Sequence, residues 1–367
     1  MLLKSKEALN LSAAAYDKLL AAGWFRGARF MNKPEYICVK GELFSPVHVR
    51  LPLEGHELTK SLRKTNRINE DRFRWQMCPC DVDEDAERLY RAQKEDFQAF
   101  IYPNLEEAIY SARGNNSFKT FSIRVYDGDK LVAMSFFDVG QNSMASLLGL
   151  HDKAYYKESL GNFTILKEIE VAKRMGLKYY YPGYVLDDLK VFGYKLRFGK
   201  FQFKDTTRRW RSIEHFEFGK TESAHFKAKF QKLVSWLETN GMKGNTRIYP
   251  LHYAFNPGID QSQFYRYPMY YELEVNGVKH AASYDPDKKT FVWSQIVKSP
   301  LHHRLLLGLE LSIDLKTQPI YEMHLLEAVK EIDLPIDILD QLEISSVTPT
   351  GQWSEPITSL SIKASFK

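Results

Sequence analysis

Apolar and polar residues near the middle of the chain follow the pattern of β-strands. The segment FSIRVYDGDKLVAMSFFDVG, residues 121–140, contains two strand-like runs separated by Asp127-Gly128, a dipeptide typical of hairpin turns. A third apolar run extends from Met144 to Leu150. We predict three consecutive strands, with a hairpin between the first two.

The spacing of apolar residues becomes helical between Asn162 and Arg174. Apolar side chains recur at every third position and define one face, which contains Phe163, Leu166, Ile169 and Ala172. Charged side chains are assigned to the other side of the helix: Lys167, Glu168, Lys173 and Arg174. Gly176 ends the helix, and an extended segment continues to Pro182, which prevents a complete hydrogen-bond ladder. The predicted order is strand, strand, strand, helix, strand.

Helical spacing also precedes these strands. One helix is predicted from Glu84 to Phe100, and a shorter one ends near Arg113. Helices before a strand meander, followed by another helix and strand, are typical of layered α+β folds. We therefore predict an α+β protein built from tandem acetyltransferase-like layers of the GNAT type.

A separate pattern begins after residue 213. It predicts a helix closed by Asn240-Gly241 and a hairpin at Asn276-Gly277. A strand is predicted over residues 291–297, and helical runs are predicted over 303–315 and 323–332. We expect an additional C-terminal α+β domain. The predicted domains are an N-terminal region with a basic segment, a GNAT-like transfer domain and this C-terminal domain: 1–80, 81–212 and 213–367.

Composition narrows the class of protein. The chain has 367 residues, of which 44% are apolar, enough for two or three domains. No apolar run reaches the roughly 18 residues that a membrane-spanning helix needs, and the N-terminus lacks a signal-peptide core. Three cysteines are too few for a disulfide framework. We expect a soluble, cytoplasmic protein.

The cysteines do not form a recognisable metal-binding pattern. Cys78 and Cys80 are close enough in sequence to share a metal ion. With Cys38, and without a nearby histidine, they leave a tetrahedral zinc site incomplete. No metal is predicted.

The net charge of +5 permits a polyanionic partner. On a helix, Lys60, Lys64 and Arg67 share one face, with Arg63 beside them. Basic side chains in this arrangement contact phosphates without reading sequence. A solvated charged face is the alternative interpretation of the same residues.

The strongest motif is SLGNFTILKEIEVAKRMGLKYYYPGYV, residues 159–185. It resembles the arginyl- and leucyl-tRNA–protein transferases in a continuous series of elements, which are Ser159-Leu160-Gly161, Ile165-Leu166, Ile169-Glu170, Gly176-Leu177 and Gly183-Tyr184. Tyr194-Lys195 resembles a further element of that family. The strand that ends at Asp138, the position of Asp152 and the basic segment HVRLPLEGHELTKSLRKTNRIN also resemble parts of that family. The resemblance covers roughly residues 15 to 205.

This resemblance implies transfer of an amino acid, arginine or leucine, from charged tRNA to the N-terminal α-amine of a protein, which marks that protein for N-end rule degradation. Aminoacyl-tRNA is then a co-substrate and no cofactor is expected. The residues expected to bind it are Ser159, Leu160, Gly161, Tyr181, Gly183, Tyr184, Lys195 and Asp152. Lys60, Arg63, Lys64 and Arg67 are expected to contact tRNA phosphates.

The expected chemistry requires no covalent intermediate, because an aminoacyl-tRNA is already an activated ester. A neutral α-amine attacks it, and positioning can supply most of the rate. Ser159-Leu160-Gly161 starts a helix, where backbone N–H groups favour phosphate or an oxyanion, although an ordinary helix cap is the alternative. Asp138 is predicted to orient the incoming amine and Tyr194 to hydrogen-bond the ester.

Two other functions remain open. An acyl-coenzyme A transferase of the same fold is one, but Glu158 and Phe163 suit a pyrophosphate turn poorly. A non-catalytic protein that binds tRNA or peptide N-termini is the other. The expected partners are aminoacyl-tRNA and protein N-termini, without a membrane.

Overall fold

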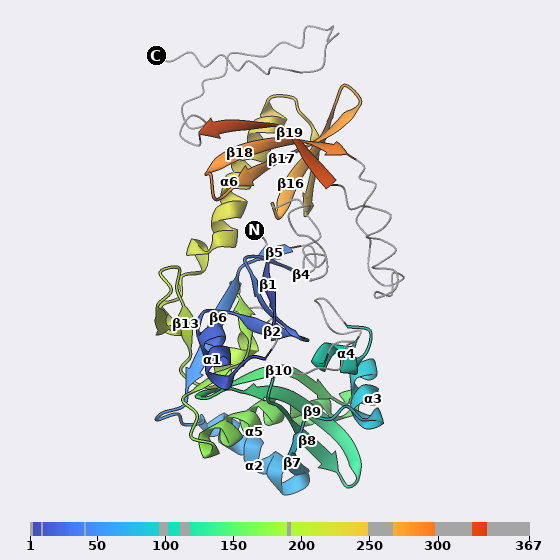
Figure 1. Ribbon diagram of the computed structural model, residues 1–367, viewed down its shortest axis with the longest axis vertical. Coiled ribbons are helices and arrows are strands. Elements are labelled where there is room, and N and C mark those ends of the chain that lie inside the picture. The colour runs from blue at the N-terminus through green and yellow to red at the C-terminus, as the bar shows by residue number, and fades with distance from the viewer. Residues whose placement is uncertain are drawn as a thin grey trace.

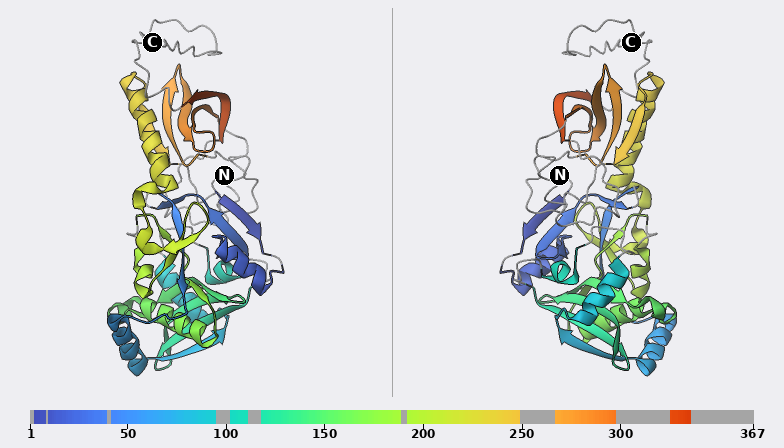
Figure 2. Two further views of the ribbon diagram at one scale, coloured as in Figure 1. Left: turned by 90° about the vertical axis from the view of Figure 1, so that its left-hand side faces the viewer. Right: turned by 90° about the vertical axis from the view of Figure 1, so that its right-hand side faces the viewer.

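The computed structural model describes residues 3–8, 10–39, 42–94, 102–110, 118–188, 192–248, 267–297 and 325–335. It is a mixed α/β protein with several sheets. Figures 1 and 2 show an elongated molecule, with a nine-stranded sheet toward one end and a five-stranded sheet toward the other.

The nine-stranded sheet has the order β14-β13-β6-β11-β10-β9-β8-β7, and β12 pairs with β6 beside this path. Its strands are β6 (Pro46–Pro52), β7 (Arg74–Pro79), β8 (Thr120–Asp127), β9 (Lys130–Val139), β10 (Ser143–His151), β11 (Tyr179–Tyr181), β12 (Tyr184–Leu186), β13 (Gln202–Lys204) and β14 (Trp210–Ser212). The three predicted central strands and the hairpin between the first two are confirmed as β8, β9 and β10. β10 and β11 are parallel because a helix crosses between them.

That helix is α5 (Leu160–Arg174), which packs on β8, β9 and β10. Phe163, Leu166 and Ile169 are buried as predicted. The assignment of Lys167 and Glu168 to the other, charged side was wrong, because both are completely buried. Lys167 forms ion pairs with Glu70 of α2 (Lys60–Arg72) and with Glu170, because α2 covers this side of α5.

The opposite face of the sheet packs against N-terminal elements (Figure 1). Tyr16 and Leu20 of α1 (Ala13–Ala21) form one hydrophobic cluster with Ala145 and Tyr181. The neighbouring short strands are β1 (Leu3–Glu7), β2 (Phe25–Gly27), β3 (Phe30–Pro34), β4 (Ile37–Val39) and β5 (Glu42–Phe44). The sheet therefore has a core on each face.

Two helices cover the end of the sheet near β9 and β10. They are α3 (Glu84–Gln93) and α4 (Leu105–Ile109), and α3 contacts both strands. The remainder of the helix predicted over 84–100, and the predicted end near Arg113, lie outside the described residues.

The nine-stranded sheet also bears on the domain division. It takes β6 and β7 from before residue 80 and its other strands from residues after it. The three domain ranges stay a prediction.

The C-terminal part pairs α6 (Glu222–Thr239) with the five-stranded sheet. Its strands are β15 (Gly244–Ile248), β16 (Met269–Val275), β17 (Val278–Asp285), β18 (Thr290–Val297) and β19 (Leu325–Pro335). The predicted helix end at Gly241 and the hairpin at Asn276-Gly277 are confirmed by their positive φ angles. The helical run predicted over 323–332 was wrong, because pairing with β18 makes this segment the strand β19.

The helical run predicted over 303–315 lies outside the described residues. Within the described ranges, no helix combines the length and the apolar character needed to cross a bilayer.

Candidate active site

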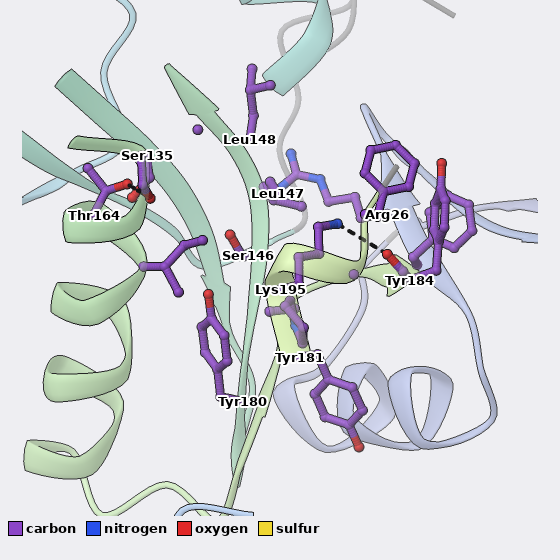
Figure 3. Close-up of a pocket in the computed structure, with 18 of the residues that line it drawn as sticks. Arg26, Ser135, Ser146, Leu147, Leu148, Thr164, Tyr180, Tyr181, Tyr184 and Lys195 are labelled. Carbon is purple, nitrogen blue, oxygen red and sulfur yellow. Dashed lines mark hydrogen bonds between the residues drawn. The ribbon is translucent and has the colours of Figure 1, made fainter. Parts of the chain in front are cut away.

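A cavity of about 840 Å³ lies where β10 and β11 separate. The two strands pair only between Ser143–Ala145 and Tyr179–Tyr181, after which Pro182 interrupts the chain and β12 turns to pair with β6. β10 continues along β9 with an irregular register between Ser146 and Leu148. The cavity is therefore bordered by Ser146 to Leu148 on one side and by Pro182 to Tyr184 on the other (Figure 3).

The start of α5 forms part of the cavity wall. Ser159 has a left-handed backbone, with φ 54° and ψ 43°, and its side chain makes no capping hydrogen bond. Ser159 is therefore the N-cap residue of α5, but it does not cap the helix through its side chain. Its carbonyl accepts hydrogen bonds from the N–H groups of Asn162 and Phe163, so Leu160 and Gly161 supply the N–H groups of the first turn. A left-handed serine is strained, and such strain is concentrated at functional sites.

Gly161 lines the cavity beside His151. A Cβ atom added at this glycine would lie 3.7 Å from the His151 Nδ1 atom, which is ordinary contact. Space in the protein therefore does not require a glycine here, and the open side faces the cavity. The predicted residues Ser159, Leu160 and Gly161 all line it.

Lys195 follows β12 on the short 3₁₀ helix η3 (Gly193–Phe198) and lines the cavity. Its ammonium group donates to the Tyr184 carbonyl at 3.2 Å and lies 4.8 Å from the centroid of the Phe192 ring. Burial lowers the pKa of Lys195 to about 8. A Cβ atom at Gly183 would be 3.4 Å from the lysine nitrogen, so the chain passes close to this amine.

The tyrosines of β11 alternate as predicted. Tyr181 packs toward α1, whereas Tyr180 belongs to the core around α5, and Figure 3 shows their rings on opposite sides of the strand. Tyr184 lies edge-to-face with Phe192, and burial raises its pKa to about 12. Tyr194 lines the cavity and is half-exposed. The structure thus brings most of the predicted binding residues together.

Glu168 is a site-associated residue that sequence reasoning missed. It is fully buried behind the wall formed by Ser135, Ser146 and Tyr180, and the Tyr180 hydroxyl donates to it at 2.7 Å. Burial raises the pKa of Glu168 to about 7, while the nearby hydroxyls of Ser135, Tyr180 and Ser146 act to lower it. Of these hydroxyls, Tyr180 donates to Glu168 Oε2, whereas Glu168 Oε1 and Ser135 Oγ have no hydrogen-bond partner among the described residues. Helical spacing gave no signal, because Glu168 lies off the predicted apolar face.

The prediction for Asp138 needs correction. This carboxylate is fully buried and is not among the residues that line the cavity. Its Oδ1 atom accepts from Arg26 at 2.6 Å and from Thr120 at 2.7 Å, while Oδ2 accepts from Tyr16 at 3.0 Å. Because other side chains in the protein bind both oxygens, the geometry does not support a direct role in orienting an incoming amine.

Arg26 is the residue that Asp138 positions. Its guanidinium group also donates to the carbonyls of Ala28 and Ile109 and lies 4.1 Å from the Phe118 ring centroid. Arg26 lines the cavity. The sequence gave no signal for it, since its partner Asp138 is 112 residues away.

Asp152 and the basic segment lie outside the cavity wall. Asp152 pairs with Lys130 at 2.8 Å and caps the 3₁₀ helix η2 (Lys153–Glu158), so its carboxylate is explained by local structure. This does not support the predicted contact of Asp152 with the substrate. The basic side chains of α2 are exposed, and their contact with tRNA stays a prediction for Lys60, Arg63, Lys64 and Arg67.

Cys78 and Cys80 are free thiols and half-buried on and just after β7. Among the described residues, no group of three or more histidine, cysteine or acidic side chains is arranged to hold a metal ion.

Comparison with known proteins gives the chemical context of this cavity. Residues 81–205 match a family described as "Arginine-tRNA-protein transferase, C terminus". An aspartate/glutamate leucyltransferase of Vibrio cholerae is 27% identical over 199 residues, which are 53% of this chain and 82% of that protein. The corresponding protein of Campylobacter jejuni is 26% identical over 200 residues, covering 51% of this chain and 78% of that protein.

These matches support a relationship of residues 81–205 to the aminoacyl-tRNA–protein transferase family. The relatives are named as aminoacyl transferases, which is consistent with an enzyme of the acyltransferase class. Ser159, Gly161 and Lys195 all fall within the matched range.

Similarity to solved structures is weaker. The C-terminal domain of a putative lysylphosphatidylglycerol synthetase from Agrobacterium fabrum aligns with a TM-score of 0.35 and 11% identity, over 42% of this chain and 57% of that one. A GCN5-related glucosamine N-acetyltransferase region of a fungal enzyme aligns with a TM-score of 0.28 and 11% identity, over 43% of this chain and 20% of that one. At these scores neither similarity defines the fold.

Proposed function

We propose that this transferase moves leucine from leucyl-tRNA to the α-amine of proteins that begin with aspartate or glutamate. The observation that carries the choice of leucine is the chemistry of the cavity wall. None of the described residues that line it is aspartate or glutamate. A buried arginine side chain needs an anionic partner, whereas leucine needs only apolar contacts.

The wall offers such contacts at the separation of the strands. Leu147 and Leu148 of β10, Ile165 of α5 and Phe192 all line the cavity. A leucine side chain placed among them loses water without leaving a polar group unpaired. The relatives named aspartate/glutamate leucyltransferase support the same choice.

The proposed preference for acceptors that begin with aspartate or glutamate is also based on the charge of the cavity wall. A first residue with a carboxylate side chain meets no like charge among the described lining residues. The N–H groups at the start of α5 add partial positive charge to the cavity. Acidic N-termini are therefore favoured over neutral and basic ones.

The reaction requires only that two groups meet. In the proposed arrangement the tRNA 3′ end lies at Ser159, Leu160 and Gly161, and the aminoacyl ester enters the gap between β10 and β12. The acceptor nitrogen forms a bond to the ester carbon, the bond from that carbon to the ribose oxygen breaks, and the ribose oxygen takes up a proton. Tyr184 and Tyr194 border this gap and are placed to hydrogen-bond the ester there.

The wider setting follows from this activity. The separating strands β10 and β11 with α5 beside them suit an acetyltransferase-type layer, which binds an acyl donor in such a gap. Transfer of leucine to an acidic N-terminus marks the acceptor for N-end rule degradation. The enzyme then acts in the cytoplasm, where charged tRNA is abundant.

A transfer assay tests this function. The protein is incubated with leucyl-tRNA or arginyl-tRNA and with otherwise identical peptides that begin with Asp, Glu, Lys or Arg. Leucine should be incorporated into the Asp and Glu peptides, with little arginine incorporation. Equal or greater arginine transfer would overturn the assignment. Acetyl-coenzyme A in place of tRNA tests the acyltransferase alternative, and tRNA binding without transfer to any peptide would favour the non-catalytic one.

A variant sharpens the donor test. Leu148→Glu places a carboxylate on the wall and should shift the ratio of arginine to leucine transfer toward arginine by about tenfold. Leu148→Met, which keeps the wall apolar, is the matched control. An unchanged ratio in Leu148→Glu would show that the side chain of the donor binds elsewhere.

A further inference from the structure

Lys195 presents an amine to the cavity without a carboxylate partner among the described residues. Its nitrogen is held by the Tyr184 carbonyl and lies against the rings of Tyr184 and Phe192. Figure 3 shows the side chain directed toward the Tyr184 carbonyl, near the labelled residues Ser146 and Leu147 of the cavity wall. An amine in this setting is free to exchange a proton with a molecule that fills the cavity.

We propose that Lys195 is the general base that removes a proton from the α-ammonium group of the acceptor before its nitrogen attacks the ester. This inference rests on the proposed function. It replaces the expectation that Lys195 only binds the substrate, and it names a catalytic residue for amine activation.

The other ionisable groups of the wall suit this task less well. Arg26 is a guanidinium, which stays protonated in proteins, and Asp138 already binds it. His48 is half-buried, and desolvation lowers its pKa to about 3, so it is a weak base. Glu168 is sealed behind the wall and does not reach the cavity. The hydroxyls of Tyr16 and Tyr180 have pKa values raised by burial.

His151 is the remaining competitor. It lines the cavity next to Gly161, and its ring nitrogen lies 3.5 Å from the Gln93 amide nitrogen. This places His151 at the start of α5, where the donor tRNA is proposed to bind. Lys195 lies on the other side of the gap, after β12, and is therefore assigned to the acceptor.

The acidity of Lys195 matches the group it would deprotonate. Burial lowers its pKa to about 8. Protein α-amines titrate between about 7.7 and 8.0, so proton transfer between the two is close to thermoneutral. Near neutral pH, part of the Lys195 population is therefore neutral and ready to accept a proton.

The step balances without a further reactant. The Lys195 amine takes one proton from the acceptor ammonium, and the neutral nitrogen attacks the ester carbon. The C–N bond forms, the C–O bond to the ribose breaks, and the second proton lost by the nitrogen goes to the ribose oxygen. Lys195 then releases its proton to solvent. The products are the extended protein, deacylated tRNA and one proton.

Replacement of Lys195 by arginine distinguishes a role as a proton acceptor from a role of the positive charge alone. Lys195→Arg keeps the positive charge but cannot accept a proton near neutral pH. It should lower the single-turnover rate of leucine transfer to an Asp-initiated peptide by about 100-fold. The dissociation constant for leucyl-tRNA should stay within twofold. A rate within threefold of the unaltered enzyme would overturn the proposal and favour an electrostatic role.

Chemical rescue provides the second measurement. Lys195→Ala should lower the rate of leucine transfer as much as Lys195→Arg does. Added primary amines should restore transfer in Lys195→Ala, and the restored rate should rise with the basicity of the amine. Ester aminolysis without enzyme is subtracted. Lys220→Met, an exposed lysine outside the cavity, is the control. Absence of rescue in folded Lys195→Ala, or loss of the rate in His151→Gln with recovery by imidazole, would assign the base elsewhere.

Failure of this inference is distinguishable from failure of the proposed function. The unaltered enzyme must first transfer leucine, which tests the function. If it does, and Lys195→Arg transfers equally well, only the role of Lys195 is wrong. If the unaltered enzyme transfers nothing, the proposed function fails, and the base assignment fails with it.

Discussion

The Tyr180 hydroxyl donates a hydrogen bond to the Glu168 carboxylate at 2.7 Å, and both side chains are fully buried between α5 and the sheet. Tyr180 lies on β11, next to the point where the strands separate. The pair therefore links the helix that begins at the cavity to the strand that ends there. Burial of an ionisable group at this junction makes stability depend on pH.

Glu168→Gln should remove that pH dependence. The pKa of Glu168 is raised to about 7 from 4.5, so the native state favours its neutral form. Its contribution is fully present below pH 4.5 and is lost as pH rises to about 7, by roughly 3 kcal/mol. The difference in unfolding free energy between the variant and the unaltered protein should therefore shift in favour of the variant by about that amount when the pH is raised from 4 to 8, as measured by urea unfolding. Glu57→Gln, at an exposed carboxylate, controls for net charge, and an equal difference at both pH values would contradict the assignment.

Asp138→Asn should act on folding, because Asp138 balances the buried charge of Arg26. Removal of one partner from a buried pair costs about 3–5 kcal/mol. The change should appear as a lower urea midpoint. Replacement of both residues, as in Arg26→Met with Asp138→Leu, should recover part of the lost stability. Full stability of Asp138→Asn with a large loss of transfer would instead restore a chemical role for this carboxylate.

Gly161→Val should abolish leucine transfer while the melting temperature stays within a few degrees. The nearest atoms outside the helix are those of His151, at ordinary contact distance, so the protein has room for a side chain. That side chain would fill the cavity beside the first turn of α5, where the donor phosphate is proposed to bind. Gly219→Val, at a glycine with no neighbour within 4 Å, is the control. Retained transfer in Gly161→Val would exclude this turn as the donor site.

Removal of the charges on α2 tests the proposed tRNA contact. Lys60, Arg63, Lys64 and Arg67 are exposed there. If they bind phosphates, their replacement by glutamine should weaken tRNA binding and flatten the log–log salt dependence by roughly one unit for each lost contact. An unchanged slope in the fourfold variant would leave them as solvated surface.

The local pattern of the sequence determined the elements that carry the site. Asp127-Gly128 specifies a hairpin, and the apolar spacing from Phe163 to Ile169 specifies α5, because both signals arise from neighbours along the chain. The motif around Ser159 and Lys195 indicated the family and the cavity residues in the same way.

Tertiary structure decided which charged groups are buried. Helical spacing placed Glu168 among the charged residues outside the apolar face, but hydroxyls from β9, β10 and β11 surround it. From the sequence, Asp138 was predicted to be a carboxylate at the end of a strand, open to substrate. In the structure it binds Arg26, which is 112 residues away in sequence. β19 formed from a helical pattern because β18 offered an edge for pairing. Each outcome depends on which distant segment packs against the residue, and periodicity along one segment contains no information about that partner.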